Sequence, residues 1–131
     1  MSNLRTDNLS PLTGGGGSIP MLTAIQGTAK AWSNLNGTGV IAPRDDFNVS
    51  SYTDNGVGDY TITFSTARPN ANYAPSGFAF DNTNTIGRGF VSNSPVSGLP
   101  TTTSFRFSAV SPGVGNNDYP LIGASILGDP H

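Results

Sequence analysis

Apolar and polar residues alternate strictly along residues 59–65, where the apolar side chains occupy the even positions. A period of two is typical of a β-strand with one buried face. A second run, residues 47–52, places Phe47 and Val49 on one face, and an Asn-Gly turn signal at residues 55–56 separates the two runs. The pattern predicts an antiparallel hairpin.

Further strands are predicted along the rest of the chain, separated by glycine and proline. An Asn-Gly pair at residues 36–37 predicts a second hairpin turn between the first two of them. No helical period of useful length interrupts the series, so we expect an all-β fold, an antiparallel β-sandwich of about eight short strands. The six additional strands are expected at residues 28–33, 38–42, 73–80, 86–92, 102–110 and 121–127.

The first 22 residues differ from this pattern. Four successive glycines at residues 14–17 follow a polar stretch and predict a flexible joint. We therefore expect an N-terminal attachment arm at residues 1–22 and a β-sandwich body at residues 23–131, with a frayed terminus as the alternative. Apolar side chains are stabilising only where something covers them, so the candidate attachment residues are Leu4, Leu9, Leu12, Ile19 and Leu22.

The composition of the chain argues against two classes of function and predicts a thin core. The formal net charge is −2, which offers no basic field for a phosphate backbone and argues against nucleic-acid binding. No run approaches the roughly 18 apolar residues of a membrane span, so no membrane insertion is expected. Leu, Ile, Val and Phe form only about 22% of the chain, which predicts a thin core that burial between subunits would supplement.

The residues needed for catalysis are scarce. Cysteine and glutamate are absent, and the single histidine is the C-terminal residue His131. Asp45 and Asp46 are adjacent, so in a strand their carboxylates point to opposite faces and cannot act together on one bond. We expect no enzymatic activity, no cofactor and no metal site. Arg44 and Asp46 are two apart and are expected to pair on one face or across a subunit boundary.

A resemblance rests on three segments: KAWSNLNGTG at residues 30–39, RDDFNVSSYTDNGVGDYTITF at 44–64, and ARPNANY at 67–73. Together they resemble a recurring module of phage tail-fibre and related virion fibre proteins, over roughly residues 28–80. The resemblance implies a β-sandwich subunit of a virion appendage, usually a homotrimer, without enzymatic activity. It further implies assembly in the bacterial host cytoplasm, contacts with other tail or capsid proteins, and contact with a host surface glycan.

Two alternatives to a short tail fibre remain open. One is a capsid decoration or head-fibre protein. The other is a stand-alone carbohydrate-binding module, with Trp32 and the four tyrosines Tyr52, Tyr60, Tyr73 and Tyr119 as platforms.

For Trp32 a core or interface position is favoured over a sugar platform. Lys30 shares its face and is expected to lie over an aromatic ring, pair with an aspartate or remain solvated. The candidate core or interface anchors are Trp32, Phe47, Phe64 and Tyr73.

Overall fold

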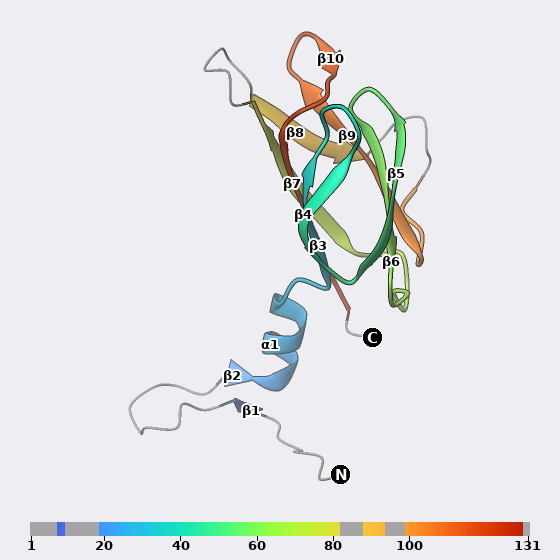
Figure 1. Cartoon of the computed structure of the whole chain (residues 1–131). Helices are drawn as coiled ribbons and strands as arrows, with labels where there is room; N and C mark the ends of the chain where they lie inside the picture. The colour runs from blue at the N-terminus through green and yellow to red at the C-terminus, as the bar shows by residue number, and fades with distance from the viewer. Residues whose placement is uncertain (1–7, 10–18, 82–87, 94–98, 130–131) are drawn as a thin grey trace.

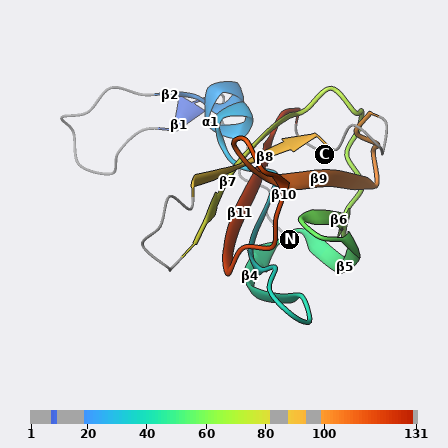
Figure 2. The ribbon, with the colours of Figure 1, turned by 90° about the horizontal axis from the view of Figure 1, so that it is seen from above.

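The protein is an all-β molecule, as its sequence predicts, in a computed structural model that describes residues 8–9, 19–81, 88–93 and 99–129. For residues 8, 9, 19, 21 and 88–93 it describes the backbone alone. Two four-stranded antiparallel layers face each other (Figures 1 and 2). The first layer consists, in order, of β4 (Ala42–Phe47), β3 (Ala31–Asn36), β11 (Leu121–Leu127) and β7 (Ala74–Phe80).

The second layer continues the same hydrogen-bonded path, because β7 pairs with β8. It consists, in order, of β8 (Arg88–Asn93), β9 (Ser104–Ser111), β6 (Asp59–Phe64) and β5 (Val49–Gly56). A short strand, β10 (Gly115–Asn116), pairs with the end of β9. Two further short strands, β1 (Asn8–Leu9) and β2 (Ile19–Pro20), pair with each other and precede the sandwich.

Both predicted hairpins are present. Strands β5 and β6 pair around Tyr52 and Ile62. Strands β3 and β4 also pair, but β4 lies at residues 42–47 and not at 38–42 as expected. The Asn36 side chain bonds Thr38 and holds the chain in an extended turn, and Gly39 has a φ of 68°. Most of the residues that were expected to form the second strand therefore lie in the connection between β3 and β4.

The expected strand at residues 47–52 is broken at Asn48, so the prediction that Phe47 and Val49 share a face is wrong. Asn48 has a φ of 57°, a left-handed conformation that asparagine tolerates better than most residues. Its side chain donates to the carbonyl of Lys30 and accepts from the backbone N–H of Thr66. Phe47 consequently ends β4 in one layer, and Val49 begins β5 in the other.

A short helix that the sequence pattern did not predict, α1 (Met21–Gly27), precedes the sandwich and crosses the expected boundary at residue 22. Lys30 joins it to the body: its Nζ donates to the carbonyls of Ile25 and Thr28 and to the Thr28 hydroxyl. Lys30 is only 6% exposed. It is neither solvated nor paired with a carboxylate or ring, because the free carbonyls at the helix end bind its ammonium group.

The core lies between the two layers. The second layer supplies large rings, and the first layer faces them mainly with alanine, leucine and isoleucine. Five rings contact in succession, with centroid distances of 5.6 to 6.2 Å. Such ring contacts add to the stabilisation from burial. In order, the rings belong to Tyr60, Phe107, Phe105, Tyr73 and Phe64.

Candidate functional site

The outer surface of the first layer carries large aromatic side chains. Along β3, Ala31 and Leu35 are fully buried, so the alternation turns Trp32 outward. Along β7, Ala79 is buried and Phe78 and Phe80 are 55% and 53% exposed. Phe47 on β4 lies opposite Trp32 and is 53% exposed. We call the surface formed by Trp32, Phe47, Phe78 and Phe80 the aromatic face.

Along β6 and β9, the outer surface of the second layer is polar by contrast. Thr61 and Thr63 on β6 lie opposite Arg106 and Ser104 on β9. Arg106 also makes a two-pronged ion pair with Asp59, with N–O distances of 2.8 and 2.6 Å. A sandwich in water normally presents polar side chains on both outer surfaces. Compared with the outer surface along β6 and β9, the aromatic face is therefore unusually apolar.

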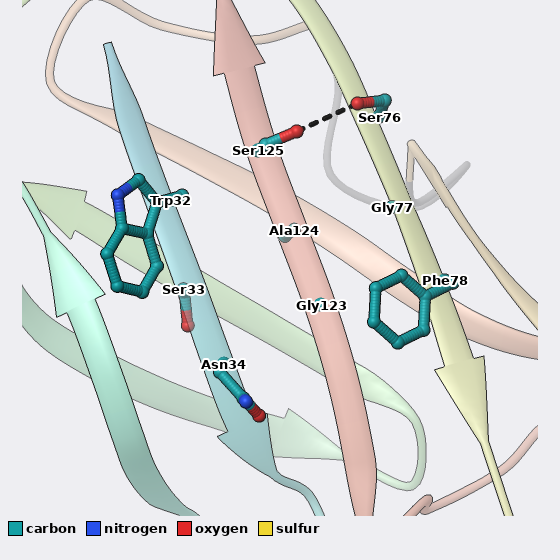
Figure 3. A pocket seen from close by; sticks show the side chains of 9 residues that line it. All are labelled: Trp32, Ser33, Asn34, Ser76, Gly77, Phe78, Gly123, Ala124 and Ser125. Carbon is teal, nitrogen blue, oxygen red and sulfur yellow. Dashed lines mark hydrogen bonds between the residues drawn. The ribbon is translucent and has the colours of Figure 1, made fainter. Parts of the chain in front are cut away.

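A groove of about 540 Å³ crosses the aromatic face (Figure 3). Trp32 from β3 and Phe78 from β7 lie on its two sides, with β11 running between them. Small residues form its floor, where Ser76 and Ser125 share a hydrogen bond of 2.8 Å. The lining of the groove also includes Ser33, Asn34, Gly77, Gly123 and Ala124.

Gly123 explains how the Phe78 ring lies in this groove. The two residues are directly opposite in the β11–β7 register. A Cβ on residue 123 would come within 2.5 Å of the Phe78 ring. The ring therefore lies against the backbone of β11, which only glycine permits, and closes one side of the groove.

The polar side chains of the groove are uncharged. Its polar side chains are hydroxyls and one amide, Asn34, whose Oδ1 is buried without a hydrogen-bond partner among the described residues. No charged residue lines it. Within residues 8–9, 19–81, 88–93 and 99–129, no three potential metal ligands cluster either. Aromatic walls and neutral polar atoms are suited to binding an uncharged partner.

A smaller recess of about 220 Å³ is lined by Arg44, Phe80, Pro120 and Leu121. Arg44 is the extra residue of β4, because the register shifts from the Asn34–Asp45 pair to the Leu35–Pro43 pair. A bulge of this kind redirects side chains at a strand edge. It places an exposed arginine at the rim of the aromatic face.

The four candidate anchors separate into two pairs. Phe64 and Tyr73 lie in the core, 5% and 7% exposed. The Tyr73 hydroxyl reaches the carbonyls of Thr101 and Ser104, and burial raises its pKa to about 12. Trp32 and Phe47 are outside the core, so for these two the core interpretation is wrong and an interface role remains as the prediction.

Three of the four tyrosines are too deeply buried to be sugar platforms. Tyr60, Tyr73 and Tyr119 lie in the core, which leaves Trp32 and Tyr52 as the partly exposed members of the predicted set. The half-buried Tyr52 bonds through its hydroxyl to Ser33 and Asp46, both at 3.0 Å, and burial raises its pKa to about 12. Within one chain Asp46 thus bonds Tyr52 and not Arg44, while the alternative of an Arg44–Asp46 pair across a subunit boundary stays a prediction.

The candidate attachment residues are only partly placed. Leu4, Leu12 and the glycine run lie outside the described residues. Leu9 and Ile19 are backbone register partners in the β1–β2 pair, and Leu22 on α1 is 59% exposed. Phe78 and Phe80, in contrast, are site residues that sequence reasoning missed. Phe78 and Phe80 are two residues apart in the predicted strand at residues 73–80, so the sequence places them on one face of that strand. Two phenylalanines on one face predict that the face is buried, whereas in the structure it is exposed.

Fold and site together define an all-β protein with one exposed aromatic face and a neutral groove. Comparison of the chain with protein-family models, curated proteins and solved structures finds no match. In the part of the chain that the structure describes, no helix has the length and apolar character needed to cross a membrane.

Proposed function

We propose that this chain is a non-enzymatic structural subunit of a bacteriophage virion, a short tail-fibre subunit that assembles as a homotrimer. The aromatic face carries the proposal. The exposed Phe47, Phe78 and Phe80, with the half-buried Trp32 beside them, present apolar surface that would be stabilised by a covering partner, since burial contributes about 1.5 to 3 kcal/mol for a large apolar side chain. On β5, β6 and β9 of the opposite layer, whose side chains the structure describes, no large apolar side chain is exposed to a comparable degree.

The position of the N-terminal segment agrees with a mounted subunit. Helix α1 and the β1–β2 pair lie at one end of the sandwich, and the β3–β4, β5–β6 and β9–β10 turns lie at the other (Figure 1). A subunit attached through residues 1–22 would therefore present these turns away from its attachment point. The resemblance over residues 28–80 supplies the virion context, and a capsid decoration or head-fibre subunit is the alternative within it.

The virion assignment is tested in particles produced from the genome that encodes the chain. Purified, salt-washed particles are analysed by quantitative mass spectrometry and labelled with an antibody against the protein. We expect the protein in a copy number that is a multiple of three, with label on the tail. Label on the head would favour the decoration alternative, and absence from washed particles would refute a virion role.

The groove supports a second candidate, a carbohydrate-binding module. Aromatic rings on both sides of a neutral trough with serine and asparagine side chains suit an uncharged sugar. Trp32 is the only tryptophan, so its fluorescence reports directly on the groove. Titration with neutral mono- and disaccharides would change Trp32 emission in a saturable way if the groove binds sugar. A Phe78→Ser variant should abolish that change.

A further inference from the structure

Two adjacent residues of opposite charge, Arg44 and Asp45, lie at the rim of the aromatic face. Arg44 and Asp45 are consecutive on β4, which lies at the end of the hydrogen-bonded path of strands. Both side chains are exposed. Arg44 borders the recess with Phe80, and Asp45 lies opposite Asn34, an outward position of β3. The rim therefore carries one positive and one negative charge next to an apolar surface.

Neither charge has an ionic partner within the described part of the chain. The ion pair found there joins Arg106 to Asp59 on the other layer. The Asp45 carboxylate accepts a local hydrogen bond of 2.9 Å from the Asp46 N–H. Covering the aromatic face would move both charges toward a low-dielectric interface, where an unpaired charge is costly.

A partner of one sign would satisfy only one of these charges. A neutral partner would satisfy neither. A second copy of the same chain carries both signs at the same spacing, so symmetry can bring each Arg44 to an Asp45 of a neighbouring copy. Around a threefold axis, each copy then donates through its guanidinium to one neighbour and accepts from the other.

We infer that the aromatic face is covered by a second copy of this chain, and that Arg44 of one copy pairs with Asp45 of the next. This inference rests on the proposed self-assembly and names its surface and its specificity contacts. The apolar side chains supply the contact area, and the charge pair sets the register in which the copies meet.

Charge reversal in the full-length chain tests the pairing. Arg44→Asp makes positions 44 and 45 both negative, next to Asp46, and Asp45→Arg makes positions 44 and 45 both positive. We expect each single variant to weaken self-association by about tenfold or more, because like charges now meet across the interface. The double variant, R44D with D45R, restores complementary pairs and should return the association constant to within about threefold of the original, since each exchanged pair remains complementary.

The measurement is sedimentation velocity over a concentration series at low ionic strength, with circular dichroism to verify that each variant is folded. Thr53→Asp, on the exposed strand β5 of the second layer, is the matched control and should associate like the original chain. Folded single variants that associate normally, or a folded double variant that stays dissociated, would overturn the pairing. A monomeric original chain would instead refute the proposed trimer itself, so the two failures are distinguishable.

Discussion

The Tyr60 hydroxyl is the most informative group to remove from the body of the sandwich. It donates to Asp118 Oδ1 at 2.6 Å, and the carbonyl of Gly37 lies 3.1 Å away. Asp118 also accepts from the backbone N–H of Gly58 at 2.7 Å. Three loops far apart in sequence therefore meet at one buried hydroxyl and one carboxylate. Burial, followed by the hydrogen bond to Asp118, raises the pKa of Tyr60, so the donor stays protonated.

Tyr60→Phe removes this hydroxyl and leaves the ring in the core. A hydrogen bond to a charged group contributes about 1.5 to 3 kcal/mol, so we expect a loss of about 2 kcal/mol in the free energy of unfolding. For a chain of this size the midpoint of thermal unfolding should fall by roughly 6 to 10 °C. Urea titration followed by circular dichroism gives the free energy directly.

Asp118→Asn completes the test, because an amide oxygen still accepts from Tyr60 and Gly58 but lacks the charge. We expect a smaller loss than for Tyr60→Phe, and a double variant whose loss is less than the sum of the two single losses. A Tyr60→Phe variant within 0.5 kcal/mol of the original chain, or strictly additive losses, would show that the hydroxyl and the carboxylate do not stabilise the loops together.

Further outcomes follow from backbone geometry, tyrosine ionisation and the arm. Gly58→Ala should cost more than about 2 kcal/mol, since φ is 61° and a Cβ would meet facing backbone at 2.5 Å. Gly113→Ala is the control, with φ of 80° and open space around it, and urea titration should show a clearly smaller loss. The free energy of unfolding should decline above about pH 10, because tyrosines ionise there in the unfolded chain, whereas Tyr52 and Tyr73 in the folded chain each have a pKa of about 12 and keep their protons. Ultraviolet titration of the native protein should show that these two tyrosines ionise only above that pH. Ionisation of both near pH 10 would contradict the prediction. A chain beginning at Thr23 should stay folded, because the core residues all follow it, yet should fail to enter particles; misfolding or normal incorporation would refute the arm assignment.

The sequence was sufficient for the elements whose signals are local. The strict alternation that became β6 and the Asn-Gly turn before it predicted the β5–β6 hairpin without reference to the rest of the chain. Helix α1 was missed because seven residues are too few to show a helical period. It is held by Lys30, which lies outside the helix and donates to the carbonyl of Ile25 in its last turn.

The faces of the first layer could not be predicted from single strands. In β3 the inward positions are Ala31, Ser33 and Leu35, and the larger Trp32 points outward. Small residues face inward here because large rings such as Phe105 and Phe107 already fill the space from the second layer. Which residues of β3 face inward therefore depends on the volumes of side chains from segments distant in sequence. The aromatic face, and with it the candidate site, therefore became visible only in the folded chain.

Self-assembly is the central claim, and the mass of the full-length protein in solution tests it most directly. Light scattering coupled to size-exclusion chromatography at micromolar concentration should give a single species of three chains, each of 13.5 kDa. A Trp32→Ser, Phe78→Ser variant, altered only on the outer surface, should remain folded and shift toward the mass of one chain. A folded original protein that elutes as a single chain at these concentrations would contradict the account.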